Sequence, residues 1–120
     1  MNKIRYLLDE NTTRVIAEQL LRRQPDMCIL VVGDELAPPR GTLDPDILFW
    51  LESEGYCLIT YNRNSMPQHL HEHLEAGHHV PGIFILKQKT PIGQIVEDLL
   101  LIWEASYPEE YQDIIVHLPF

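Results

Sequence analysis

The sequence predicts an α/β fold built on a parallel sheet, and two observations lead to this class. Short apolar runs of strand length alternate along the chain with longer segments in which apolar residues recur every three or four positions. The apolar runs hold few polar residues, which is typical of strands buried on both faces by helices. We expect right-handed crossovers and a single domain spanning residues 1–120.

Five apolar runs are the predicted strands, and turn-forming residues separate them from the helices. They span residues 3–8, 27–32, 56–61, 83–86 and 114–116. Cys28 and Cys57 fall inside two of these runs. Their spacing matches no metal site, so we expect both to be buried, reduced core residues.

Four segments have helical periodicity, at about residues 13–24, 44–54, 65–76 and 92–103. Thr12 or Thr13 is expected to cap the first helix, Asp44 the second and Ser65 the third. The buried face of the first helix is predicted to contain Val15, Ile16, Leu20 and Leu21.

The composition limits the classes of function. A net charge of −9 opposes non-specific attraction to nucleic acid, yet it leaves room for a nucleic-acid enzyme that uses divalent cations, and it suits a basic protein partner. No apolar stretch reaches the ~18 residues of a membrane span, and charged residues interrupt the first apolar run too soon for a signal peptide. We therefore expect a cytoplasmic protein without membrane contact.

Polar side chains gather where the predicted strands end. They are Asp9–Asn11 after the first strand, Asp44 and Asp46 at the start of the second helix, and Asn62 and Asn64 after the third strand. Ligands bind at the carboxyl ends of parallel strands. Oxygen ligands suit Mg²⁺ or Mn²⁺, which activate water and neutralise phosphate charge in phosphodiester cleavage.

A structural explanation of the same residues also stands. Asp44 and Asp46 fit a helix start, and Asn62 and Asn64 fit a turn. Asp9 is harder to explain in this way, because a carboxylate at the end of a buried strand costs free energy unless it is paired or hydrogen-bonded.

Three segments taken together, Leu7–Asn11, Asp44–Leu48 and Leu58–Asn64, resemble the PIN-like family of small bacterial proteins. That family is related to PIN-domain nucleases, including the VapC-type toxins of toxin–antitoxin pairs. The resemblance covers nearly the whole chain. It implies a three-layer α/β/α sandwich around a mainly parallel sheet, with acids that bind Mg²⁺ or Mn²⁺ for cleavage of RNA.

Carried over residue by residue, the resemblance places the central metal ligand at Asp9 and the second acid at Asp44 or Asp46. Glu10 would support the ion, and Asn62 would serve as a neutral ligand or orient water.

The third motif departs from the family pattern, which usually has two aspartates where this chain has Asn62 and Asn64. An amide brings no charge and cannot act as a base. We therefore expect one ion rather than two, and a reduced activity.

Two arginines, Arg40 and Arg63, lie in loops predicted near the acids. Either could bind the phosphate of the substrate, with Arg63 the better candidate because it lies inside the third motif. Ion pairing with a nearby Asp is the alternative.

Five of the six histidines form a cluster: His69, His71, His73, His78 and His79. His69 and His73 are spaced i, i+4 and could bind zinc or nickel on one helix face. A solvated, histidine-rich helix and loop is the alternative.

Three functions follow. The first is a ribonuclease of toxin type, with RNA as substrate and a small antitoxin-like protein as partner. The second is a non-catalytic PIN-like module that acts through a protein partner. The third is a flavodoxin-like or response-regulator-like domain, against which the third-strand loop and the lack of a suitably placed Lys weigh. Apolar residues on more than one face of 92–103 would suit a homodimer, and Trp50, Trp103, Tyr107 and Phe120 are expected in the core or an interface.

Overall fold

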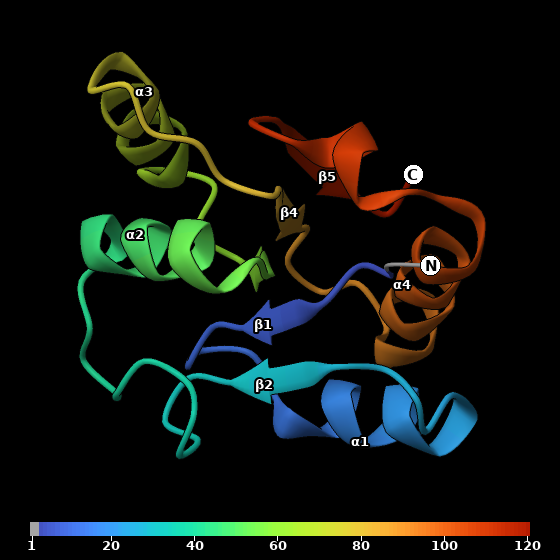
Figure 1. The fold of residues 1–120 in the computed structure, drawn as a ribbon. Coiled ribbons are helices and arrows are strands. Elements are labelled where there is room, and N and C mark those ends of the chain that lie inside the picture. Colours follow the sequence, from blue (N-terminus) through green and yellow to red (C-terminus); the bar gives the residue numbers. More distant parts are fainter. Residues whose placement is uncertain (1–2) are drawn as a thin grey trace.

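The computed structural model describes residues 3–120 and confirms the predicted α/β class (Figure 1). One sheet contains five parallel strands: β1 (Tyr6–Leu8), β2 (Ile29–Val31), β3 (Cys57–Thr60), β4 (Ile83–Leu86) and β5 (Ile115–Leu118). The α-helices are α1 (Arg14–Arg23), α2 (Asp44–Glu54), α3 (Met66–Glu75) and α4 (Ile92–Ala105), and a 3₁₀ helix, η1 (Pro108–Tyr111), precedes β5.

The helices cover both faces of the sheet, which gives the expected three-layer α/β/α sandwich (Figure 1). Because side chains alternate along a strand, Tyr6 and Leu8 of β1 face α1 and α4, while Leu7 faces α2 and α3. All three side chains are fully buried. Burying each one contributes about 1.5–3 kcal/mol, so the two cores hold β1 firmly in the interior of the sheet, between β2 and β3.

The strand order is β2-β1-β3-β4-β5. The chain leaves β1 toward one edge to form β2 and then returns to the other side of β1 to form β3. Parallel sheets bind ligands at such a reversal, in the crevice beyond the carboxyl ends of the strands. Flavodoxin-like folds share this order, so the topology fixes the place of a site without fixing its chemistry.

One of the two cysteines departs from the prediction. Cys57 lies in β3 and is buried, as expected, whereas Cys28 is exposed and precedes β2. Met27 is buried instead, because the chain turns its side chain inward just before β2 begins at Ile29.

The buried face of α1 is narrower than predicted. Ile16, Ala17 and Leu20 are buried, whereas Val15 and Leu21 are 38% and 37% exposed. Only one stripe of this helix contacts the sheet and α4, so residues at its flanks stay in contact with solvent.

The helix caps also differ in part. Thr13, one of the two residues predicted to cap α1, is its N-cap, and its hydroxyl accepts the backbone N–H of Val15. Leu43 rather than Asp44 is the N-cap of α2, and Ser65, although it is the N-cap of α3, makes no capping bond with its side chain. Asp44 and Ser65 use their side chains in the candidate site instead.

Three further expectations concern apolar surfaces. Trp50 and Trp103 are half-buried against the two cores, but Tyr107 and Phe120 are 59% and 71% exposed, so neither is a core residue. The large apolar residues of α4 are mostly buried within this chain, and Leu101 is exposed. No helix within residues 3–120 is both long and apolar enough to span a membrane.

Candidate functional site

Asp9 lies directly beyond β1, at the reversal of strand order. Its backbone N–H continues the pairing of β1 with β3 by donating to the Ile59 carbonyl (2.9 Å). Its carboxylate accepts the Glu10 backbone N–H at Oδ1 (2.8 Å) and the Thr60 hydroxyl at Oδ2 (2.9 Å). The carboxylate is therefore fixed at the crevice by both strands.

The pKa of Asp9 is raised above its ordinary value. Burial is the largest cause, and the charges of Asp44 and Glu10 add to it, while the hydrogen bonds from Thr60 and the Glu10 backbone act in the opposite direction. Asp44 is thus close enough to Asp9 for the two carboxylates to repel each other. A cation placed between them would relieve this repulsion.

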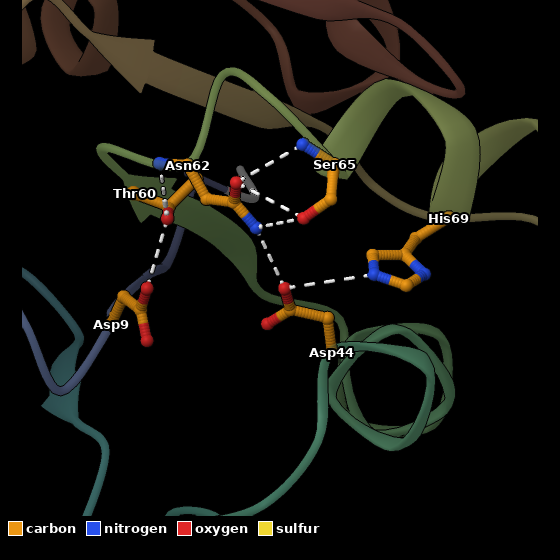
Figure 2. A network of polar contacts seen from close by, with 6 residues as sticks. All are labelled: Asp9, Asp44, Thr60, Asn62, Ser65 and His69. Atoms are coloured by element: carbon orange, nitrogen blue, oxygen red, sulfur yellow. Dashed lines mark hydrogen bonds and ion pairs between the residues drawn. The ribbon is translucent and has the colours of Figure 1, made fainter.

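Asn62 joins the two acids to α3, as Figure 2 shows. Its side-chain N–H donates to Asp44 Oδ2 and to Ser65 Oγ, each at 2.8 Å. Its oxygen accepts the Ser65 backbone N–H at 3.2 Å, and His69 Nε2 lies 3.9 Å from Asp44 Oδ2. The side-chain N–H of Asn62 therefore faces Asp44. Its oxygen, the atom that could bind a metal, faces Ser65 instead. We call Asp9, Asp44, Thr60 and Asn62 the acidic crevice.

The other predicted acids lie at the margin of this crevice. Glu10 Oε1 accepts the backbone N–H of Gly41 (2.8 Å), so it ties the loop before α2 to the end of β1. Asp46 is exposed in the first turn of α2, and Asn64 is exposed in the turn before α3.

Neither predicted arginine forms an ion pair with the acids within residues 3–120. Arg40 lies over Gly33, where an added Cβ would come within 3.1 Å of its Cγ. Arg63 lines a cavity at the ends of β4 and β5, beside Lys87 and His117.

A second cavity, of about 550 Å³ and distinct from the one at Arg63, opens at Asp9 of the acidic crevice. It is lined by Asp9, Asn11, Thr13, Tyr61, Asn62 and Gln88. Residues of the site that the sequence-based set lacks include Thr60, Tyr61, Ser65 and Gln88. Thr60 could have been included, because it lies inside the third motif, Leu58–Asn64, two positions before Asn62. Gln88 comes from the loop after β4, and no local pattern indicates it.

The crevice fits a single hydrated ion better than a fully coordinated one. Mg²⁺ binds through one or two carboxylates and keeps several waters. Asp9 and Asp44 could supply those two carboxylates. Within residues 3–120, no three His, Cys, Asp or Glu side chains form a group that could hold a metal. His69 turns to Asp44 and His73 to Glu52, so the i, i+4 pair forms no joint site.

Comparisons with protein-family models, with curated proteins and with solved structures found no match to this chain. The resemblance to the PIN-like family therefore rests on the three sequence motifs, and the function is a proposal.

Proposed function

We propose that this protein is a PIN-like, Mg²⁺- or Mn²⁺-dependent ribonuclease of toxin type, with activity reduced by the two asparagines of its third motif. The observation that supports this most is the polar network at the reversal of strand order, in which Thr60 and Asn62 donate hydrogen bonds to the carboxylates of Asp9 and Asp44. Within residues 3–120, no Lys or Arg pairs with either of these half-buried acids, and acids in such surroundings are typical of functional sites.

The residues of the chain have separable roles in this proposal. Asp9 and Asp44 would hold the ion, which when bound supplies activation of water and neutralisation of phosphate charge. Thr60 and the Glu10 backbone keep Asp9 oriented, and Asn62 keeps Asp44 oriented. Since Asn62 cannot take up a proton from water, its presence predicts slow cleavage.

A second candidate function is a non-catalytic PIN-like module that acts through a protein partner. The Asn62 amide favours it, because this group already donates to Asp44 where a cation would otherwise stand. A small, basic, antitoxin-like protein would suit the net charge of −9 in either function. Both functions place the protein in the cytoplasm.

Calorimetric titration of Mn²⁺ distinguishes the two. We expect the parent protein to bind with a millimolar or lower Kd, Asp9→Asn to lose this binding, and Asp46→Asn, an exposed matched control, to keep it. RNA cleavage should also be lost in Asp9→Asn. If the parent takes up no Mn²⁺, the ribonuclease proposal lacks a mechanism and the second candidate gains support.

A homodimer is a separate part of the proposal, with the exposed Leu101 of α4 at the contact. Light scattering at micromolar concentration tests it. A monomeric mass would count against the dimer.

A further inference from the structure

Beside the acidic crevice lies a basic cleft at the carboxyl ends of β4 and β5. We define it by Arg63, Lys87, Lys89, His117 and Phe120. We propose that the basic cleft binds the phosphate backbone of a single-stranded RNA whose reacting phosphate lies at the acidic crevice. This inference rests on the proposed ribonuclease function.

The basic cleft adjoins the cavity at Asp9, because the two share a lining residue. Two cavities, of about 410 and 670 Å³, make up the basic cleft and share Lys87, Pro119 and Phe120 in their linings. Gln88 lines the larger of the two and also the cavity at Asp9. A strand of nucleic acid could therefore run from Asp9 past Gln88 to Phe120 without leaving the surface.

The charge of the cleft is opposite to that of the protein. The chain carries a net charge of −9 and nine Lys and Arg residues, of which three line the cleft. Within the described residues, no Asp or Glu side chain lines either cavity, and the three cations form no ion pair. Arg14 and Arg23, by contrast, pair with Asp34 and Glu97. The cleft cations are thus available for phosphates, which supply most of the affinity in nucleic-acid binding.

The loop after β4 holds Lys89 in an unusual conformation. Its φ is +67°, in the left-handed region that favours glycine, and Thr90 closes the turn by donating from its hydroxyl to the Lys87 carbonyl (2.7 Å). A lysine at this position costs free energy that a glycine would not. Strained residues of this kind gather at ligand sites, which agrees with a binding role for the Lys89 ammonium.

Aromatic rings beside the cavities favour a single strand over a duplex. Phe120 is 71% exposed and lines both cavities of the cleft, while the partly buried Tyr61 packs against the core and lines the cavity at Asp9. Proteins that bind single strands combine a cationic groove with aromatic side chains on which unpaired bases stack. A duplex offers no unpaired base for Phe120 or Tyr61.

Fluorescence anisotropy with a fluorescein-labelled oligouridine at low salt tests the proposal, with EDTA present so that binding is separated from cleavage. The cleft variant is Arg63→Ala, Lys87→Ala, Lys89→Gly, in which glycine preserves the backbone conformation at position 89. The control is Lys3→Ala, Arg22→Ala, Arg23→Ala, which removes the same charge at the other end of the sheet. Circular dichroism establishes that both variants fold.

We expect the cleft variant to bind the oligouridine at least about tenfold more weakly than the parent. A plot of the logarithm of the binding constant against the logarithm of the salt concentration should be shallower by about two in slope, because three phosphate contacts are lost. The control should change by less than about threefold. Equal weakening in both variants, or no RNA binding by the parent, would overturn the proposal. Duplex RNA bound as tightly as the single strand would also overturn it.

A small phosphodiester separates this proposal from the ribonuclease proposal. Bis(p-nitrophenyl) phosphate needs the acidic crevice but not the basic cleft. The double variant Lys87→Ala, Lys89→Gly, which keeps Arg63, is used for this assay. Hydrolysis with Mn²⁺ that this double variant retains, together with its loss of RNA affinity, supports both proposals. RNA binding through the cleft without hydrolysis of either substrate supports the cleft and contradicts the ribonuclease proposal.

Discussion

The two ends of the sheet place carboxylates in opposite electrostatic situations. At the carboxyl end, burial and the neighbouring charges of Asp44 and Glu10 raise the pKa of Asp9, and no Lys or Arg within residues 3–120 pairs with it. At the amino end, desolvation of Glu52 also opposes its ionisation. However, the backbone N–H of His79 and the imidazoles of His78 and His73 lower its pKa overall.

The amino end holds a set of side chains that we call the histidine cluster: Glu52, His73, His78, His79 and Asp113. One oxygen of Glu52 lies 3.2 Å from His73 Nε2 and 3.2 Å from His78 Nδ1. The rings of His73 and His78 stack with centroids 5.0 Å apart. His79 Nδ1 lies 2.6 Å from Asp113 Oδ2, so the cluster joins α2, α3 and the turns before β4 and β5.

The comparison separates an end of the sheet where acids are paired with histidines from an end where the acid Asp9 has no Lys or Arg partner within residues 3–120. In the histidine cluster, Glu52 pairs with His73 and His78, and these contacts together with the other pair of the cluster connect four segments of the chain. In the acidic crevice, burial raises the pKa of Asp9, and within residues 3–120 no Lys or Arg pairs with this carboxylate. The following predictions test that contrast, from the largest expected effect to the smallest.

The first prediction concerns His73, whose side chain is only 3% exposed. His73→Ala should lower the free energy of unfolding by about 2 kcal/mol, because it leaves a cavity beside Phe49 and His78 and removes a buried hydrogen-bonding group. Denaturation in urea measures this. His71→Ala on the exposed face of the same helix should change it by less than about 0.5 kcal/mol. Equal effects in the two variants would show that the cluster has no structural role.

The second prediction adds charge to the acidic crevice. Asn62→Asp should tighten Mn²⁺ binding about tenfold, or 1.4 kcal/mol, because a carboxylate replaces the amide that now donates to Asp44. Calorimetric titration measures the change. Asn64→Asp adds the same charge at an exposed position and serves as the control. An unchanged Kd in Asn62→Asp would mean that the ion does not bind beside Asp44.

The third prediction removes charge from the same crevice. Because the pKa of Asp9 is raised in the folded protein, its ionised form opposes folding at neutral pH, and this cost disappears as pH falls through the folded pKa. Asp9→Asn without metal should therefore stabilise the protein by roughly 0.5–1 kcal/mol at neutral pH. Denaturation at neutral and at acid pH measures the gain. A loss of stability at neutral pH would show that the Asp9 charge is compensated.

The fourth prediction concerns pH and the histidine cluster. The pKa of His79 is raised by its hydrogen bond to Asp113, so its stabilising effect is complete below the unfolded value of 6.5 and is lost as pH rises through the folded pKa. The lowered pKa of Glu52 gives a contribution that is present above 4.5 and lost as pH falls through the folded pKa. The cluster should therefore be most stabilising between about pH 4.5 and 6.5.

A series of melting temperatures checks this dependence. The difference in Tm between the parent and His79→Gln should be largest near pH 6 and should narrow by about pH 8. The effect is the smallest of the four, since the His79 side chain is 63% exposed and solvent screens its charge. A difference independent of pH would contradict an ionic role for His79.

The sequence predicts the sheet and helices well because their signals are local. Apolar runs and helical periodicity indicate all five strands and all four α-helices of the described chain. The ends of strands also place Asp9 and Asn62 correctly. Details that depend on packing were predicted less well: only tertiary contacts decide that Met27 turns inward and Cys28 outward.

The candidate site is predictable only in part, because its geometry depends on partners distant in sequence. Asp44 matches a helix cap by pattern, yet its carboxylate accepts from Asn62, which lies 18 positions further along the chain. His73 belongs to a polar, histidine-rich segment, but Glu52 allows it to be buried. A sequence pattern within one segment can predict neither the contact of Asp44 with Asn62 nor that of His73 with Glu52.

The contrast between the two cysteines has a practical consequence for chemical labelling. Burial raises the pKa of the Cys57 thiol to about 12, so this thiol forms almost no nucleophilic thiolate at neutral pH. Cys28 is exposed. A maleimide dye should therefore attach at Cys28 alone, without any engineered cysteine, which gives a fluorophore at the amino end of the sheet for observing unfolding or the approach of a partner.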